Sequence, residues 1–527
     1  MHMGDILPMN ARRTPGKVAV HDVRGSLTYA DLDARTNSLA NALLDLGMVP
    51  RGNVAILVGN RIEHIESILA VAKAGAVGVP MDTKWKAREL SGALSFFDIT
   101  GIIAETAMAA ELAQALGELS DFKGPLIWIG GPPADFKAPS YDYEKLIAKT
   151  AATRPEVAIG SADTFLIMIT SGTTGFPKGC LISHQEYIYR SLNQAIGRGV
   201  SSEDIELAVV PICFNSGRGS VLAHLLFGAT IILKDKFDPE DTLATIEREK
   251  VTYIALAPVQ CERILQSPQL GRYDTSSLLC LRKAGSPLSR RTVEGLIEHV
   301  TPNVYQTYSS TDSGTLSLLL PTEQLTKYGS SGRLIWASEA QIVDDQGLPL
   351  PPGAVGEIIC RGPLTCKGYY NNPQANAANF RDGWLLTGDL GRFDEEGYLS
   401  IVGRKKNVIK SGSISIFPDE IQEVLQSHPQ VFEAAVFGVP DAEWGEAVTA
   451  VVSLRSGEAL NGADLIGYCK ARLAAYKAPK LVRVVDSLPH TELGKVSIER
   501  VKSQQLQILN EEKGNATGEN ITGEETT

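Results

Sequence analysis

A loop rich in glycine and hydroxyl side chains is the part of this sequence best suited to bind phosphate. The segment 170–179 reads Thr-Ser-Gly-Thr-Thr-Gly-Phe-Pro-Lys-Gly and follows a run of β-favouring residues at 165–170. Glycines let the backbone fold over a polyphosphate and point N–H groups at it, the hydroxyls add donors, and Lys178 adds a positive charge. The segment therefore predicts a phosphate cradle at the edge of a sheet, with an ordinary surface turn as the alternative.

The spacing within this loop separates it from the common P-loop. It follows G-x-x-G-x-x-K-G, and Gly179 stands where a P-loop has the Ser or Thr that binds magnesium. The sequence therefore argues against a P-loop kinase or GTPase.

Composition narrows the classes of protein further. A chain of 527 residues is long enough for about three or four compact units. The net charge of −11 argues against a non-specific nucleic-acid binder. Seven cysteines, scattered without a CxxC pair, predict reduced thiols in a cytoplasmic protein. The segment 1–16 lacks the apolar core of a signal peptide, and the most apolar stretch, 68–80, is too short to span a membrane.

The elements that must position the loop follow an α/β pattern over the first 400 residues. A helical pattern at 29–46 precedes an apolar strand at 54–58, and a second helix at 62–74 precedes a strand at 76–80. Further apolar strands with helices between them are expected at 207–211, 230–233, 253–257 and 279–283. This alternation predicts stacked α/β layers.

The pattern changes after about residue 329. Short strands with frequent Gly, Pro and Asp turns predict a small β-barrel or a meander over about 329–403. The charged cluster 404–407 then marks a boundary, and a compact α+β pattern follows. We therefore expect a large N-terminal domain over 1–403, a small C-terminal domain over 404–505 and a disordered tail over 506–527.

Four further motifs join the loop in a recognisable order. They are Tyr308-Ser309-Ser310-Thr311-Asp312, Thr387-Gly388-Asp389, Gly403-Arg404 with Lys410-Ser411-Gly412, and Leu493-Gly494-Lys495. Together with the loop they closely resemble the signature of the adenylate-forming superfamily, which includes acyl-CoA synthetases, peptide-synthetase adenylation domains and beetle luciferases. The resemblance covers about residues 10–505. Each motif alone could be a turn or a solvated charge run; their order is what makes the resemblance specific.

The resemblance implies an ATP-dependent acyl-CoA ligase. Such an enzyme joins a carboxylic acid to AMP, releases pyrophosphate, and then exchanges AMP for a thiol. ATP, Mg²⁺ and coenzyme A would be its cofactors. Because the acid and the triphosphate are both anions, the site must supply cations and N–H donors in a cleft with little water. A homodimer is compatible with the resemblance.

The resemblance also implies a role for each matching residue. Lys495 would bridge the carboxylate and the α-phosphate, Thr311 would contact the α-phosphate, and Asp312 would bind Mg²⁺. His184 is a secondary catalytic candidate, with helix capping or packing as the alternative. The residues assigned to nucleotide or CoA are Thr170, Ser171, Gly172, Thr173, Thr174, Gly175, Lys178, Gly285, Ser286, Pro287, Tyr308, Ser309, Asp389, Arg404 and Gly412. Among these, Asp389 suits the ribose hydroxyls and Tyr308 the adenine ring.

The second half-reaction would need a mobile C-terminal domain. The resemblance places the hinge at Lys406 and the wall of the pantetheine tunnel at Gly412. Free CoA is the expected acceptor, since no carrier domain is attached; a stand-alone adenylation enzyme that loads a carrier protein, or performs one half-step, is the alternative. A degenerate nucleotide-binding scaffold is a third reading. It rests on two departures from the family pattern, Asp312 in place of Glu and the apolar Ile414 after Gly412.

The acyl pocket is where the sequence says least. By resemblance it would be lined by Phe214, Asn215, Val259, Ser310 and Gly332. These residues are mostly small or neutral, which disfavours an amino-acid substrate and favours a hydrophobic, alicyclic, aromatic or medium-chain acid. Arg218 would suit a second carboxylate if it faced the pocket, with a solvent-facing position as the alternative.

Overall fold

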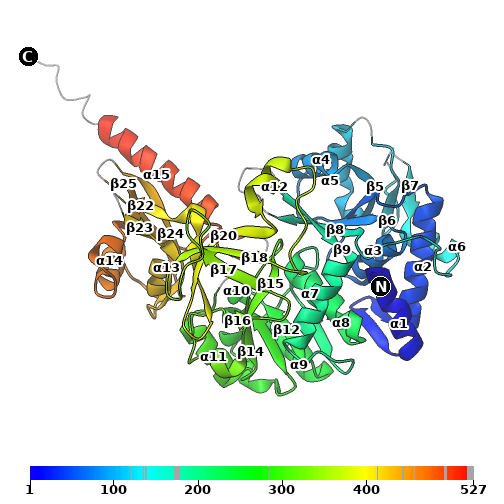
Figure 1. Cartoon of the computed structure of the whole chain (residues 1–527), viewed down its shortest axis with the longest axis horizontal. Coiled ribbons are helices and arrows are strands. Elements are labelled where there is room, and N and C mark those ends of the chain that lie inside the picture. Colours follow the sequence, from blue (N-terminus) through cyan, green and yellow to red (C-terminus); the bar gives the residue numbers. More distant parts are fainter. Residues whose placement is uncertain are drawn as a thin grey trace, which may run out of the picture.

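A seven-stranded sheet forms the first layer of this computed structural model (Figure 1). The structure describes residues 1–119, 122–134, 136, 139–170, 178–283, 285, 287–411, 414–441, 444–455, 457–491 and 495–518. The strand order is β7 (Ser140–Asp142), β6 (Leu126–Ile129), β5 (Ile99–Glu105), β3 (Asn53–Leu57), β4 (Val77–Pro80), β8 (Thr164–Thr170) and β9 (Lys178–Ser183). Only β9 runs antiparallel to its neighbour, because it forms a hairpin with β8. This hairpin flanks the predicted phosphate loop.

A nine-stranded sheet forms the second layer. Its order is β16 (Arg333–Leu334), β15 (Gly314–Leu319), β14 (Val304–Ser310), β13 (Cys280–Lys283), β12 (Tyr253–Leu256), β10 (Ile205–Ala208), β11 (Thr230–Leu233), β1 (Val18–Asp22) and β2 (Gly25–Thr28). The pairs β1–β11, β11–β10, β10–β12, β12–β13 and β13–β14 are all parallel. The carboxyl ends of parallel strands meet at one edge, where ligands bind in open α/β sheets.

Helices pack between and outside these two sheets. One hydrophobic core joins both sheets to the helices between them, α1 (Ile6–Arg13), α2 (Tyr29–Asp45), α3 (Ile62–Lys73), α7 (His184–Ile196) and α8 (Asn215–Phe227). A second core places α4 (Ala87–Phe96) and α5 (Ala109–Gly117) on the outer face of the first sheet. A third places α9 (Pro239–Glu249), α10 (Pro258–Leu265) and α11 (Arg290–His299) outside the second sheet. The stacked α/β layers expected from the sequence are confirmed.

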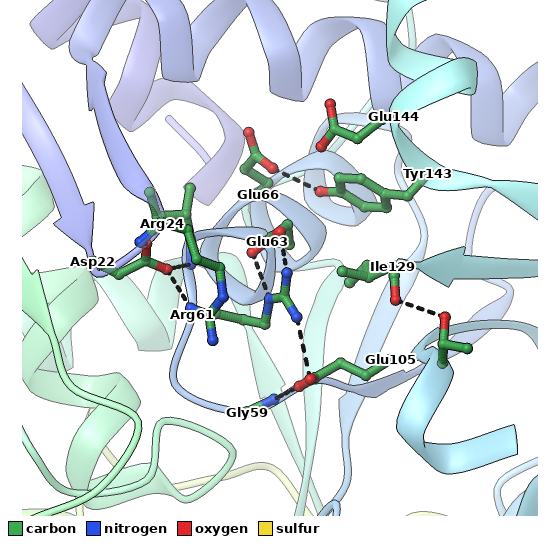
Figure 2. Close-up of polar contacts among 12 residues, drawn as sticks. Asp22, Arg24, Gly59, Arg61, Glu63, Glu66, Glu105, Ile129, Tyr143 and Glu144 are labelled. Atoms are coloured by element: carbon green, nitrogen blue, oxygen red, sulfur yellow. Dashed lines mark hydrogen bonds and ion pairs between the residues drawn. The ribbon is translucent and has the colours of Figure 1, made fainter. Parts of the chain in front are cut away.

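Buried ion pairs tie the N-terminal layers together. Glu66 on α3 is fully buried, forms an ion pair with Arg35 on α2, and accepts a hydrogen bond of 2.9 Å from Tyr143 at the start of α6 (Tyr143–Lys149). Figure 2 shows Tyr143 facing Glu66, with Arg61 between two further carboxylates. Removing one partner of such a pair costs about 3–5 kcal/mol, because the other charge stays buried. The network fixes α2, α3 and α6 as one unit.

The remaining β-rich segment forms a separate sheet. Its five antiparallel strands are β17 (Glu339–Val343), β18 (Gly356–Arg361), β20 (Trp384–Phe393), β19 (Phe380–Arg381) and β21 (Leu399–Arg404). Beside it lies α12 (Pro373–Asn379). A small β unit was expected from about residue 329; its sheet begins at Glu339, because β16 pairs with β15 in the second sheet.

A small α+β domain follows and lies on the left in Figure 1. Its sheet contains β22 (Ile409–Ser411), β23 (Ile414–Ile416), β24 (Val431–Asp441), β25 (Gly445–Leu454) and β26 (Leu481–Val485). The helices α13 (Pro418–Gln426) and α14 (Gly462–Lys470) cover one core, and α15 (Ile498–Gly518) covers the other. Among the described residues, no helix is long and apolar enough to cross a membrane.

The tail departs from the sequence-based prediction. Disorder was expected over 506–527, but α15 continues to Gly518. Leu506 and Leu509 continue the apolar face of Val501 onto the sheet, and these three side chains share one hydrophobic cluster. Packing of this face stabilises the helix well past residue 505. Residues 519–527 lie outside the described part of the chain.

Candidate active site

The two ends of the predicted phosphate loop lie opposite each other in the β8–β9 hairpin. Thr170 and Lys178 are paired in its register, and the Thr170 hydroxyl donates to the Lys178 carbonyl over 3.4 Å. The Nζ of Lys178 lies 4.7 Å from the centre of the Tyr369 ring. Residues 171–177 of the loop, which include the predicted site residues Ser171, Gly172, Thr173, Thr174 and Gly175, lie outside the described residues. The hairpin thus fixes where the loop begins and ends.

The predicted magnesium ligand lies beside this hairpin. The Tyr369 hydroxyl donates to Oδ2 of Asp312 over 2.7 Å. Arg190 on α7 donates to the carbonyls of Thr311 and Asp312 over 2.8 and 3.2 Å, and to that of Leu364 over 2.7 Å. The structure therefore brings Lys178, Tyr369 and the Thr311–Asp312 turn together. Sequence reasoning missed Tyr369 and Arg190, which belong to none of the recognised motifs.

Asp389 is the centre of a second cluster. This carboxylate is 5% exposed; Arg404 Nε lies 2.7 Å from its Oδ1, and the Tyr308 hydroxyl donates to its Oδ2 over 2.6 Å. Burial raises the pKa of Asp389, and Arg404 opposes that rise. Asp389 on β20 and Arg404 on β21 are direct cross-strand neighbours. Tyr308 was expected to stack on adenine. In the structure its hydroxyl orients the Asp389 carboxylate, the group expected to bind the ribose.

Lys495 from the C-terminal domain reaches this cluster. Its Cε lies 2.7 Å from where a side chain on Gly285 would begin, and Gly285 has a φ of +89°. The positive φ favours a glycine there, and any larger side chain would have to displace the end of the Lys495 side chain. Burial lowers the pKa of Lys495, Arg404 lowers it further, and Asp389 raises it. Pro287 follows Gly285, while Ser286 lies outside the described residues.

Lys283 is a site residue that sequence reasoning missed. It ends β13, is 5% exposed, and donates to the carbonyls of Thr307 and Gly285 over 3.3 and 3.4 Å. Burial and the nearby Lys495 lower the pKa of Lys283 to about 7. The available signal was the pair Arg282-Lys283, two cations at the carboxyl end of an apolar strand. The structure therefore places two lysines, Lys283 and Lys495, next to Gly285.

His184 is not among the residues that the structure brings together here. It is 1% exposed, its Nδ1 accepts from the Met3 N–H over 3.1 Å, and its ring stacks on Phe165 at 5.2 Å. Burial lowers its pKa to about 4, so the ring is neutral. These contacts support the packing alternative, and a catalytic role finds no support among them.

The residues predicted for domain movement lie at the surface or outside the described part. Lys406, the predicted hinge, forms an exposed ion pair of 3.1 Å with Glu499. Gly412 lies outside the described residues, and Ile414, just after it, is 40% exposed. The hinge and the tunnel wall remain predictions.

The predicted acyl-pocket residues are spread over several elements. Phe214 caps α8, Asn215 begins it, and Val259 lies on α10. Ser310 ends β14, next to Ser309, which was assigned to the nucleotide or CoA. Gly332 has a φ of +90°, and a side chain there would meet the Leu318 carbonyl. A small polar cavity between α7 and α8 includes Asn215; its other lining residues include Ser191, Gln194, Gly219 and Thr315.

Arg218 does not face solvent. It is 2% exposed and donates to the carbonyls of Ile212 and Cys213 over 3.2 and 2.6 Å. The solvent-facing reading was wrong because α8 is buried between the two sheets, and the guanidinium instead stabilises the turn before that helix.

Comparisons with known proteins agree with this arrangement. A family model described as AMP-binding enzyme matches residues 7–370, and one described as AMP-binding enzyme C-terminal domain matches residues 420–495. Indoleacetate–CoA ligase of Aromatoleum aromaticum is 33% identical over 505 residues, which cover 95% of this chain and 98% of that protein. Feruloyl-CoA synthase of an Amycolatopsis species is 34% identical over 488 residues, covering 92% and 95%. The structure of ATP-bound MatB from Rhodopseudomonas palustris superposes with a TM-score of 0.86 at 27% identity, covering 96% of this chain and 99% of that one.

Proposed function

This chain belongs to the AMP-binding enzyme family, and we propose from that premise that its adenylation site is the cluster of Lys178, Asp312, Asp389, Arg404 and Lys495. The chain is an ATP-dependent acyl-CoA ligase that forms acyl-AMP, releases pyrophosphate and transfers the acyl group to CoA. The observation that carries the assignment is the convergence of Lys495 with Gly285 and the Asp389–Arg404 pair.

The first step joins two anions, so charge placement decides its rate. A carboxylate oxygen of the acid attacks the α-phosphorus, a C–O–P linkage forms, and the bond from the α-phosphorus to the bridging oxygen breaks as pyrophosphate leaves. Lys495 would lie between the carboxylate and the α-phosphate and offset the charge that builds up there. Lys178 would hold the leaving pyrophosphate, and Asp389 would hold the ribose hydroxyls. The chain thus contributes mainly positioning and electrostatic stabilisation.

Asp312 fits the family's Mg²⁺. The described residues contain no group of three or more His, Cys, Asp or Glu side chains that could hold a metal alone. Mg²⁺ is commonly held by one or two carboxylates together with substrate phosphates and water. One Asp312 oxygen receives the Tyr369 hydroxyl, which fixes the carboxylate, and the other oxygen would bind the ion. When bound, Mg²⁺ would neutralise phosphate charge.

The second step would follow rotation of the C-terminal domain at Lys406. Rotation would withdraw Lys495 and bring the segment around Gly412 to the acyl-adenylate. The thiolate of CoA then attacks the acyl carbon, a thioester forms, and AMP leaves. The cytoplasm as the compartment is part of the proposal, supported by seven free cysteines, six of them buried. A homodimer is likewise proposed and is testable by light scattering.

Loss of the Lys495 amine provides the test of this assignment. We expect Lys495→Ala to slow acid-dependent exchange of pyrophosphate into ATP by about 10²- to 10³-fold, since one electrostatic donor at a transition state contributes that much. Indoleacetate, ferulate and 2-succinylbenzoate, the acids of named relatives, begin the acid panel. The same variant should still transfer the acyl group of a supplied acyl-adenylate to CoA.

The matched control is Lys470→Ala, which removes an exposed lysine from the same domain. It should leave both half-reactions unchanged. Unchanged exchange in the Lys495 variant would disprove the role given to this lysine. Thioester formation only with an added carrier protein would disprove CoA as the acceptor.

A further inference from the structure

We propose that Lys283 is a second catalytic lysine, whose ammonium binds the carboxylate oxygen that becomes the carbonyl oxygen of the acyl-adenylate. The inference rests on the proposed function, because it assigns a role within the same two-step reaction. Lys283 ends β13 of the N-terminal domain, whereas Lys495 belongs to the C-terminal domain that is proposed to rotate. Lys283 would therefore stay beside the substrate in both steps, and Lys495 in the first step alone.

The Lys283 amine is buried with incomplete hydrogen bonding. The side chain is 5% exposed, and its Nζ donates to the carbonyls of Thr307 and Gly285 over 3.3 and 3.4 Å. Both contacts are longer than the ~2.7–3.2 Å of an ordinary N–H···O hydrogen bond. An ammonium has three N–H donors, so these two carbonyls leave at least one donor for a ligand.

The groups around this amine supply no negative charge. Within the part of the chain that the structure describes, Lys495 and Arg282 act on Lys283 as cations, and the remaining titratable group that acts on it is the Cys261 thiol on α10. Burial raises the pKa of that thiol, which therefore stays uncharged at neutral pH. An anion bound beside the amine would favour its charged form, and the acid to be activated is an anion.

Gly285 brings the two lysines to one point. Its carbonyl accepts from Lys283 Nζ, and the Cε and Nζ of Lys495 lie 2.7 and 3.7 Å from where a side chain on this glycine would begin. Because Lys495 would bridge the carboxylate and the α-phosphate, the carboxylate would lie beside Gly285, within reach of the Lys283 amine. Lys283 also adjoins Cys261 on α10, the helix that carries the predicted pocket residue Val259. Its neighbours are thus the helix of the predicted acyl pocket and the lysine of the first step.

One fixed cation at this oxygen would serve both half-reactions. In the first, it would offset the charge of one carboxylate oxygen while the other attacks the α-phosphorus, so the two anions repel each other less. In the second, the CoA thiolate bonds to the acyl carbon and the electron pair of the carbonyl moves to its oxygen. Lys283 would stabilise this oxyanion until the pair returns, the bond from the acyl carbon to the phosphate oxygen breaks, and AMP leaves. The amine stays protonated throughout.

The test measures the two half-reactions separately in Lys283→Met and Lys495→Ala. The acid is whichever of indoleacetate, ferulate, 2-succinylbenzoate, benzoate and hexanoate supports exchange in the wild type. We expect Lys283→Met to lower kcat/KM for the acid in pyrophosphate exchange by about 10- to 100-fold, chiefly through KM for the acid, with KM for ATP unchanged. It should also slow thioester formation from a supplied acyl-adenylate by about 10- to 100-fold, whereas Lys495→Ala should lose exchange alone.

Matched variants complete the comparison. Lys236→Met, which removes an exposed lysine from the same domain, should leave both half-reactions unchanged. Lys283→Gln keeps a donor for the two carbonyls and serves the same comparison where Lys283→Met fails to fold.

A pH profile separates a role of the charge from a role in packing. Burial, Lys495 and Arg282 lower the pKa of Lys283 to about 7, so kcat/KM for the acid should decline in the wild type as pH rises above about 7. Lys283→Arg stays charged, so it should retain part of the activity and show the decline only at higher pH. The residual activity of Lys283→Met should lack the decline near pH 7.

Three results would overturn the inference. They are wild-type rates of both half-reactions in Lys283→Met, a loss of exchange with normal acyl transfer, and a decline near pH 7 that persists in the Arg and Met variants. Each leaves the ligase function intact, because Lys495→Ala reports on that function separately. Absence of exchange with every acid in the wild-type enzyme would count against the proposed function instead.

Discussion

At the scale of single residues, Lys283 shows how burial alters a group's chemistry. Its amine has backbone carbonyls as partners and two cations, Lys495 and Arg282, nearby. Its pKa of about 7 lies well below the ordinary 10.5 of an unfolded chain. The folded protein therefore binds fewer protons than the unfolded chain between pH 7 and 10.5. The resulting penalty on stability is complete below pH 7 and shrinks as pH rises toward 10.5.

Replacing Lys283 should remove this penalty. We expect Lys283→Met to raise the melting temperature more at pH 6 than at pH 10, by at least about 2 °C, because the wild-type charge is forced into a buried site only at the lower pH. Differential scanning calorimetry at the two pH values measures the difference. The exposed control Lys470→Met should show no pH-dependent change. Equal shifts at both pH values would contradict the lowered pKa.

At the scale of elements, the turn after β13 depends on one glycine. Gly285 combines a φ of +89° with direct contact to Lys495. We expect Gly285→Ala to slow pyrophosphate exchange by about 10-fold or more, since strain of this kind costs 1–3 kcal/mol. Acyl transfer from a supplied acyl-adenylate should fall less, because the proposed domain rotation would then have withdrawn Lys495.

Gly271→Ala is the control for that prediction. Gly271 has no atom within 4 Å of a new side chain and is not in the left-handed region. Both half-reactions should proceed normally in this variant. Equal losses of exchange and transfer in Gly285→Ala would mean that the glycine serves the turn alone and not the approach of Lys495.

At the scale of the whole molecule, contacts between the two domains hold Lys495 in place. Arg455 of the C-terminal domain forms an ion pair of 3.1 Å with Glu262 on α10, and both side chains are less than one-fifth exposed. Arg291 donates to the Pro429 carbonyl over 3.5 Å. These contacts belong to the orientation in which Lys495 lies beside Gly285.

Weakening the Arg455–Glu262 pair should disfavour that orientation. We expect Arg455→Met to slow pyrophosphate exchange about 2- to 5-fold, the effect of a partly exposed ion pair, with acyl transfer unchanged or faster. Single-turnover measurements of each half-reaction distinguish the two effects. Arg472→Met, at an exposed position in the same domain, is the control. A loss confined to acyl transfer would contradict the assignment of the pair to the adenylation orientation.

Much of the fold and part of the site could be predicted from the sequence. Periodicity located α2 and β3, because buried strands and amphipathic helices leave a local signature. Asp389, Arg404 and Lys495 belong to short contiguous motifs, so resemblance could name them. The alternation of layers and the small C-terminal domain followed from the same patterns.

Other features depend on contacts that the sequence does not display. Tyr369 reaches Asp312 across 57 positions, and Arg282 reaches the Tyr253 hydroxyl across 29. His184 drew attention by its position after the loop, but packing on Phe165 decided its environment. The extent of α15 was underestimated because Leu506 and Leu509 stabilise it only when the sheet beneath is present.

The cross-strand pairing of Asp389 with Arg404 has a consequence for the fate of the intermediate. Arg404 ends β21, two positions before the proposed hinge, and is held in register with Asp389 by the strand ladder. A torsional change at Lys406 would turn everything after it and leave this pair on the stationary side. The mixed anhydride would thus stay anchored by its ribose while the acceptor arrives, protected from escape and wasteful hydrolysis between the two steps.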